Sequence, residues 1–228
     1  MIRPRWQALK PQHGLFSWRR WDQAIAVIAA VNLTWVAIDL TYIPLRNFWL
    51  QRNLYPVPSL PLVVPLPWLP DITPWLDPLK GIEPHRDTEA YLKAYTALDR
   101  ALQQNGPRTA ESNDLLQHQV VLTTALMDSN PFISSGQAGA LEKFKNRLRA
   151  RTGLESARDS ANLLLSPEHL ERSPWSQERQ FWSQQILPLV ESNYWRSIDE
   201  NGRPSDLSWR IDTPFQLLFL LDILLRAW

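Results

Sequence analysis

The sequence predicts an all-α protein in which one or two transmembrane helices carry an inserted soluble helical domain and a proline-rich extended strap. Three observations lead to this expectation. The apolar run 24–45 is long enough to cross a bilayer core, which needs roughly 20 residues. A second apolar segment, 206–228, ends the chain. Between about 85 and 200, apolar residues recur three and four positions apart, as in amphipathic helices, and no useful strand pattern appears.

The composition narrows the function classes. The 228 residues carry a net charge of +1, which gives no sign of nucleic-acid binding. The absence of cysteine excludes disulfides, thiolate metal sites and a cysteine nucleophile. The four histidines are far apart, no HExxH, GxSxG or Walker pattern occurs, and the grouping of Glu111, Asp114 and His118 is typical of solvated surface charge. We therefore expect no catalytic residue, no metal and no cofactor.

Residues 1–23 form a basic, aromatic arm before the first predicted transmembrane helix, 24–50. Five Lys or Arg residues precede the apolar run, whereas Arg46 and Arg52 follow shortly after it. Because cytoplasmic flanks carry the excess of basic residues, we expect a cytoplasmic N-terminus and an extracytoplasmic helical domain. A cleaved signal peptide is the alternative, but the run is too long and lacks a small-residue cleavage site. The helix should continue past Pro44, which loosens one turn.

Two polar residues interrupt this span, Asn32 and Asp39. They are seven positions apart and therefore share one face of a helix. A carboxylate in hydrocarbon is costly, so Asp39 should face protein, water or the membrane interface. Two interpretations stay open: a hydrated Asp39 near the rim of the membrane, or a buried Asp39 with a partner.

Residues 51–84 are rich in proline. Because proline lacks an N–H and disrupts helices and central strands, we expect an extended, polyproline-II-like strap over protein or over the membrane surface. The apolar residues of the strap argue against a solvated linker, and a proline-rich ligand for a small recognition domain is the alternative. Tryptophans are expected as anchors at the membrane interface, at positions Trp18, Trp21, Trp49, Trp68 and Trp75.

The predicted helical domain spans 85–205. Its first helix should bury one apolar stripe, and Thr109 should cap the second helix. Ser173-Pro174 should start the fifth helix, which should kink at Pro188. The expected helices are 87–105, 109–129, 137–152, 155–165 and 173–198, and the stripe of the first consists of Tyr91, Tyr95, Leu98 and Leu102.

One face of the third expected helix is strongly basic. Such a face is suited to contact anionic lipid headgroups or an acidic partner. An ordinary solvated helix face is the alternative. The residues concerned are Lys143, Lys145, Arg147, Arg149 and Arg151.

The C-terminal segment has a regular pattern of its own. Four residues lie at i, i+7, i+10 and i+14 and share one helical stripe: Asp212, Phe219, Asp222 and Arg226. The pattern resembles the second helix of voltage-sensor domains in voltage-gated cation channels, where an outer acid, a phenyl ring, an inner acid and a basic residue recur. The resemblance implies that Asp212 is the outer countercharge and Phe219 the hydrophobic plug. It makes Asp222 and Arg226 the inner charge pair, for which an i,i+4 pair near the interface is the alternative.

The resemblance covers only 24–45 and 206–228, and Asn32 matches a polar residue that the first helix of that family often carries. The inserted domain is far larger than the usual loop, and no third helix, arginine-rich sensor or pore filter occurs in the chain. The resemblance implies a non-enzymatic integral membrane protein, part of an ion-transport protein. The alternative is a membrane-anchored scaffold or assembly subunit that contacts other transmembrane helices or subunits. Because the apolar run reaches Trp228, we expect a fragment of a longer chain.

The charges of this segment need partners if it crosses a bilayer. A charge at the centre of a lone helix costs about 2.5–3.5 kcal/mol on insertion scales. An exposed i,i+4 pair returns about 0.3–0.5 kcal/mol. We therefore expect Asp222 and Arg226 to lie near the interface, in a hydrated crevice or against other helices. Within the chain, Asn32 and Asp39 are the candidate partners.

Overall fold

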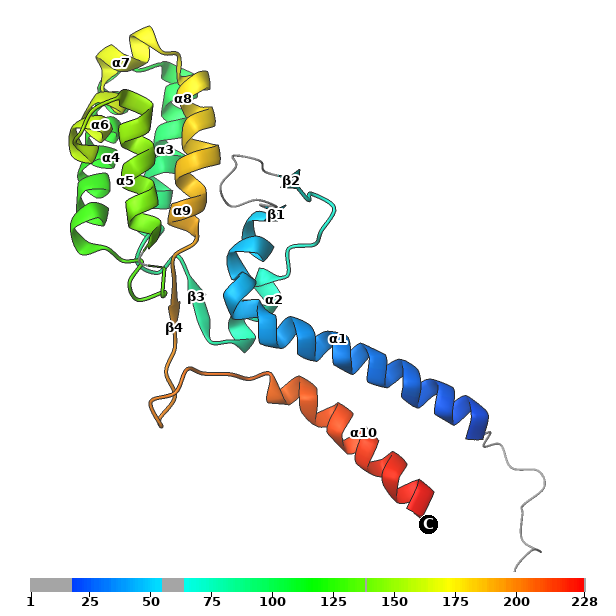
Figure 1. Cartoon of the computed structure of the whole chain (residues 1–228). Coiled ribbons are helices and arrows are strands. Elements are labelled where there is room, and N and C mark those ends of the chain that lie inside the picture. The colour runs from blue at the N-terminus through cyan, green and yellow to red at the C-terminus, as the bar shows by residue number, and fades with distance from the viewer. Residues whose placement is uncertain (1–17, 55–63, 138, 228) are drawn as a thin grey trace, which may run out of the picture. The chain divides into compact units, whose positions relative to one another are not determined.

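The structure is a computed structural model that describes residues 18–54, 64–137 and 139–227. The described residues are mainly helical, which confirms the all-α expectation (Figure 1). Parts of the predicted basic arm, 1–17, and of the predicted strap, 55–63, lie outside the described residues.

The chain forms two compact units. The first, called the helix-pair unit, combines Met1–Pro44 with Leu207–Trp228. The second, called the helical unit, is Leu45–Asp206. The helical unit therefore begins well before residue 85 and includes the described part of the proline-rich segment.

Two long helices build the helix-pair unit. α1 (Trp18–Gln51) starts in this unit and continues past Pro44 without a break, as the sequence predicts. α10 (Trp209–Ala227) is the second helix. The hydroxyls of Thr34 and Thr41 donate to carbonyls one turn earlier in α1, so these polar groups are satisfied within their own helix.

The helical unit is a bundle of short helices with two short strand pairs (Figure 1). Its helices are α2 (Thr73–Leu79), α3 (Glu89–Asn105), α4 (Ala110–Ser129), α5 (Gly139–Thr152), α6 (Ala157–Leu164), α7 (Pro167–Arg172), α8 (Trp175–Phe181), the π-helical turn η1 (Trp182–Ile186) and α9 (Leu187–Glu191). Its strands are β1 (Asn53–Leu54), β2 (Val64–Pro65), β3 (Ile82–Pro84) and β4 (Tyr194–Arg196).

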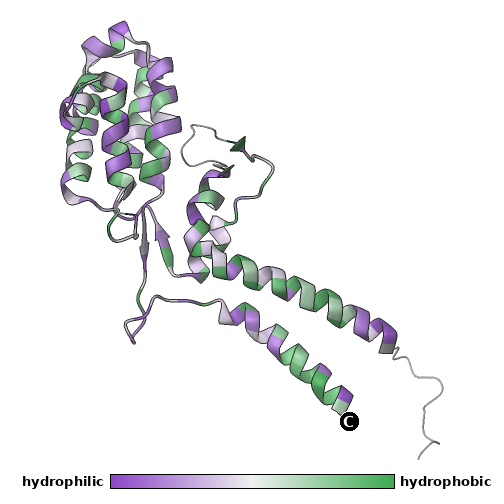
Figure 2. Cartoon of the chain, in the orientation of Figure 1, coloured by the Kyte–Doolittle hydropathy of each residue, from purple (hydrophilic) through white to green (hydrophobic). Residues whose placement is uncertain are grey.

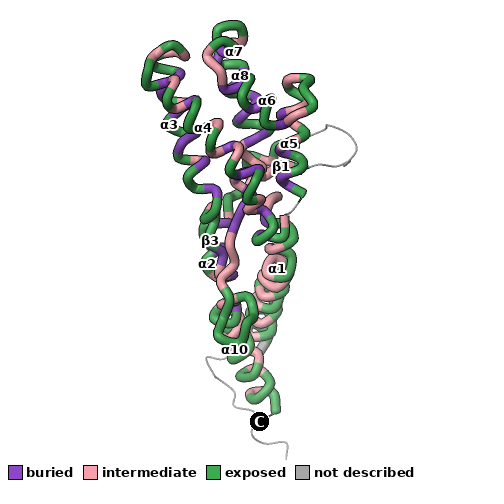
Figure 3. Tube along the Cα trace, turned by 90° about the vertical axis from the view of Figure 1, so that its left-hand side faces the viewer, coloured by how far each residue is buried: buried purple, intermediate pink, exposed green. Residues whose placement is uncertain are grey.

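The core of the bundle is built from apolar stripes at helical spacing. On α3, the predicted stripe that includes Tyr91, Tyr95 and Leu98 is buried (Figure 3). Tyr91 meets Phe144 of α5 edge to face, with ring centroids 6.3 Å apart. Tyr95 lies 6.3 Å from the fully buried ring of Trp182 in η1. These contacts tie α3, α5 and η1 into one core.

Side-chain caps start several of these helices. Thr109 accepts a hydrogen bond from the Ser112 N–H at the start of α4, as predicted. Ser156 caps α6 in the same way. Ser166 caps α7, with Pro167 in its first turn, and this short helix is missing from the expected set.

The expectation of one helix over 173–198 is wrong. The segment divides into α8, η1 and α9, and the last of these ends at Glu191. Pro188, which has no N–H for a helical hydrogen bond, lies two residues after the end of the π-helical turn. Ser173 does not cap α8, because its hydroxyl donates to the Glu178 carboxylate instead.

β4 (Tyr194–Arg196) pairs antiparallel with β3, and this explains why α9 ends at Glu191 and does not reach residue 198. Gly81, just before β3, has φ +61°, a conformation that glycine adopts without strain. A Cβ atom at position 81 would come within 2.4 Å of the Ser197 hydroxyl oxygen, so the close approach of the chains also requires glycine. The strands are too short for an alternating pattern to be visible in the sequence.

The expectation that prolines keep the strap extended is wrong for α2. Pro74 lies in the first turn of α2, where an N–H has no intrahelical partner. Pro78 lies in the last turn and removes one helical hydrogen bond. Leu76 and Asp77 are buried, so contacts with the rest of the helical unit offset that loss.

A buried carboxylate joins α5, α7 and α8. Glu178 on α8 is fully buried. It accepts hydrogen bonds from Arg151 at 2.8 Å and from Ser173 at 2.6 Å, and His169 Nε2 lies 3.2 Å from the same oxygen. Burial raises the pKa of Glu178, but these hydrogen bonds lower it by more, so the pKa lies below its ordinary value.

Glu178→Gln should make the helical unit less stable at neutral pH and less sensitive to acid. Because the folded pKa lies below the unfolded value of about 4.5, the stabilisation is present above that pH and is lost as pH falls through the folded pKa. The measurement is the free energy of unfolding of the full chain in detergent, by circular dichroism from neutral to acid pH. Glu155→Gln, at an exposed acid between α5 and α6, is the control. Equal acid sensitivity of the wild type and Glu178→Gln would contradict this role.

Candidate functional site

Hydrogen bonds between side chains join α1 to α10 along the helix-pair unit. Trp21 Nε1 donates to Asp222 Oδ1 at 2.7 Å. Trp35 Nε1 donates to Asp212 Oδ1 at 2.9 Å. As residue numbers rise along α1 they fall along α10, so the two helices are antiparallel neighbours (Figure 1).

Asp39 also has a partner within this unit. The hydroxyl of Ser208, one residue before α10, donates to Asp39 Oδ1 at 2.5 Å. Asp39 therefore has the partner that the second interpretation expects, but it is half-buried and not buried. Asn32 lies on the same half-buried face of α1 as Trp35 and Asp39. Asn32 and Asp39 therefore share the face from which α1 bonds to the α10 segment.

A charged cluster lies where α10 ends and α1 begins. Arg226 Nε lies 2.9 Å from the Asp222 carboxylate, and its Nη2 lies 2.6 Å from Asp22 Oδ1. Sequence reasoning named partners in the middle of the first span and missed Asp22. The available signal was topological: if two antiparallel helices both span, the start of one lies beside the end of the other.

The outer faces of both helices are apolar, the reverse of a helix pair in water. Figure 2 shows long hydrophobic stretches along α1 and α10, and Figure 3 shows that these stretches are largely exposed. Exposed aliphatic side chains with partnered polar groups between the helices are the arrangement expected in hydrocarbon. The exposed residues include Val27, Val31, Leu33 and Leu40 on α1 and Leu217, Leu220, Leu221, Ile223 and Leu224 on α10.

Among the described helices, α1 is the one that is long and apolar enough to cross a membrane, over Arg19–Gln51. Its apolar stretch is not buried inside the protein, unlike the core helix of a soluble domain. A signal sequence near an N-terminus passes the same test of length and composition. α10 is shorter and carries four charged residues, Arg210, Asp212, Asp222 and Arg226.

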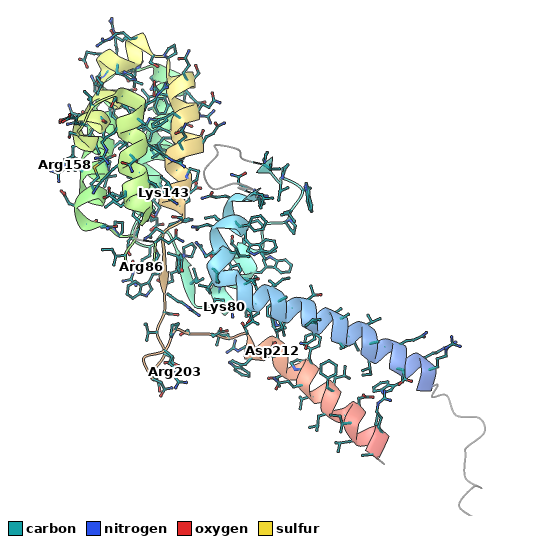
Figure 4. All side chains as sticks on the ribbon, in the orientation of Figure 1. Lys80, Arg86, Lys143, Arg158, Arg203 and Asp212 are labelled. Atoms are coloured by element: carbon teal, nitrogen blue, oxygen red, sulfur yellow. The ribbon has the colours of Figure 1, made fainter. Side chains whose placement is uncertain are left out.

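The four residues of the voltage-sensor-like stripe all lie on α10. Asp212 (labelled in Figure 4), Phe219 and Asp222 are half-buried, and Arg226 is more exposed. Both acids accept hydrogen bonds from tryptophans of α1. Phe219 lies between the two acids in the sequence and, like them, is half-buried.

The five predicted tryptophan anchors fall into different surroundings. The side chain of Trp18 lies outside the described residues. Trp21 bonds to α10, and Trp49 is half-buried with its ring 5.2 Å from that of Phe48. Trp68 and Trp75 are strongly exposed. Contact of these two rings with a membrane interface stays a prediction.

Most of the predicted basic face of α5 is engaged within the helical unit. Lys145 pairs with a neighbouring glutamate, Arg147 donates to the backbone carbonyl of residue 185, and Arg151 pairs with Glu178. Arg149 donates to an asparagine of its own helix. Lys143 is exposed (Figure 4). Contact of this face with anionic lipid stays a prediction.

Two ion pairs hold α2 inside the helical unit. Arg46 makes a bidentate contact with Asp77, with Nε at 2.9 Å and Nη2 at 2.7 Å, and both side chains are almost fully buried. Lys80 (labelled in Figure 4), the residue after α2, pairs with Asp206 at 2.8 Å. Arg46 is also stacked over the Tyr194 ring at 4.8 Å. Sequence reasoning missed these pairs, whose partners are far apart in the chain.

The described part of the chain, 18–54, 64–137 and 139–227, holds no group of three or more His, Cys, Asp or Glu that could bind a metal ion. Comparison with protein-family models, with curated proteins and with solved structures finds no match to the chain.

The Trp35–Asp212 hydrogen bond should be measurable as a coupling energy. In a double-mutant cycle of Trp35→Phe and Asp212→Leu, the two changes should couple by about 0.6–1.7 kcal/mol, as interhelical hydrogen bonds in membranes do. The free energy of unfolding of the full chain, from denaturant titration in mixed micelles, supplies the four values. Trp68→Phe, at an exposed position of the helical unit, should not couple to Asp212→Leu. Additive effects of Trp35→Phe and Asp212→Leu would contradict the contact.

Proposed function

We propose that the protein is a non-catalytic, membrane-anchored scaffold. α1 and α10 cross the bilayer as an antiparallel hairpin and hold the helical unit outside the cytoplasm, where its surface is available to subunits of a larger membrane complex. The observation that carries the proposal is the inverted polarity of the helix pair: hydrogen bonds lie between the helices and aliphatic side chains face outward.

The length and partners of α10 support a second span. A helix of 19 residues is about 28 Å long, close to the roughly 30 Å thickness of the hydrocarbon core. Its charges lie toward its two ends, Arg210 and Asp212 near the start and Asp222 and Arg226 near the end. Asp212 and Asp222 each accept a hydrogen bond from α1. The insertion cost of the acids is therefore reduced by pairing, which a lone α10 lacks.

A voltage-sensor-like part of an ion-transport protein is the second candidate. The ion pair of Asp222 with Arg226 favours it, because the resemblance implies this inner charge pair. In a sensor, the acids stabilise arginines that move past them. Here the acids bond to Trp21 and Trp35, which belong to the partner helix of the same hairpin. Because both acids already accept hydrogen bonds from α1, the geometry favours a fixed anchor over a moving sensor, and we rank the scaffold first.

Single cysteines test the topology, since the chain has none of its own. In intact cells, a membrane-impermeant maleimide should label Gln103→Cys, at an exposed position of α3, and should label Gln7→Cys only after lysis. Leu220→Cys, on the apolar face of α10, should stay unlabelled in both conditions because thiols in hydrocarbon do not ionise. Labelling of positions 7 and 103 from the same side, or of Leu220→Cys as fast as Gln103→Cys, would contradict the two-span hairpin.

A further inference from the structure

We propose that α2 lies in the headgroup layer of the bilayer and inserts Trp75 there, so that lipid holds one face of the helical unit. The proposal rests on the proposed function, since it requires that α1 and α10 span. It assigns a lipid-binding surface to a segment that the sequence alone predicts to be extended.

The two ion pairs of α2 determine where it lies along the chain's path. Asp77 is bound to Arg46, two residues after Pro44, where the helix-pair unit ends. Lys80 is bound to Asp206, directly before Leu207, where that unit resumes. The C-terminal end of α2 is therefore paired with two residues, Arg46 and Asp206, that lie close in the sequence to the ends of the proposed spans. If the apolar run 24–45 and α10 span, we infer from this chain connectivity that the last turn of α2 lies near the membrane surface.

The exposed face of α2 has a composition suited to lipid. Its buried side contains the polar Thr73 and Asp77 and the apolar Leu76. Its exposed side consists of Pro74, Trp75 and Pro78, and Trp75 is 81% exposed. The two prolines lack an N–H, so this face presents fewer unpaired backbone donors to a poorly hydrated environment.

Tryptophan is the side chain that the headgroup layer favours. An indole ring buries a large apolar area while its N–H stays near water, and tryptophans are enriched at membrane interfaces. Trp68, seven residues before Trp75, is 75% exposed and extends the same apolar segment. A protein partner is the competing occupant of this surface, and the experiment below separates the two.

Spin labels on single cysteines measure the depth of α2 directly. The full chain is purified with a label at Trp75→Cys or at Pro78→Cys on the same face, and placed in nanodiscs of phosphatidylcholine and phosphatidylglycerol. The ratio of collisions with oxygen to collisions with a water-soluble nickel chelate should be several-fold higher at both positions than at Val121→Cys. Val121 is the matched control because it is an exposed apolar residue of α4 in the same unit. Circular dichroism checks that each variant is folded.

Labels at Val27→Cys and Leu220→Cys separate this inference from the proposed function. If the collision ratio places these two labels in hydrocarbon while the ratio at positions 75 and 78 equals that at Val121→Cys, the α2 inference is overturned and the two-span hairpin is supported. If all of these positions resemble water, both proposals are overturned. Low access of both collision partners to positions 75 and 78 would mean that protein, such as a second copy of the chain, covers α2, and this too overturns the inference.

Discussion

The requirement that polar groups in a low-dielectric environment have partners governs the helix-pair unit. The donors Trp21 and Trp35 on α1 meet the acids Asp222 and Asp212 on α10, and Asp39 accepts from Ser208. If the pair lies in a bilayer, removing one helix leaves the other with unpaired indole N–H groups and carboxylates, each at a cost of several kcal/mol. The two helices therefore depend on each other, although almost the whole helical unit separates them in the chain.

A second constraint acts on α2. The bidentate Arg46–Asp77 pair is nearly fully buried, and truncating one partner of such a pair costs about 3–5 kcal/mol because a charge stays buried without compensation. The net stability of the intact pair is smaller, since both groups lost their hydration. Its structural consequence is specificity: the guanidinium of Arg46 accommodates one planar arrangement of the carboxylate, and this sets the position of α2.

Local patterns predicted the parts of the fold that local contacts decide. The α3 stripe of Tyr91, Tyr95 and Leu98 and the Thr109 cap follow from helical spacing and capping chemistry, and both are present. α2 did not follow from the sequence, because prolines disfavour a helix unless distant contacts compensate, as the contact of Arg46 with Asp77 does.

The candidate site shows the same division. The spacing of Asp212, Asp222 and Arg226 on one stripe could be read directly from the sequence. Their partners could not, because Trp21 and Asp22 lie some 200 positions away and no periodicity connects them. In the same way, the end of α9 depends on the pairing of β3 with β4, which brings together strands more than 100 residues apart.

Hydrogen–deuterium exchange of the full chain in lipid nanodiscs tests the central claim most directly, namely that α10 is the membrane-embedded partner of α1. The account predicts that backbone amides in the middle of α10, around Leu217–Leu224, are as strongly protected as those of α1 around Ile28–Asp39. The exposed turn at 199–203 should exchange rapidly in the same sample. If the α10 amides exchange as fast as this turn while α1 stays protected, α10 neither spans nor pairs with α1, and the account is wrong.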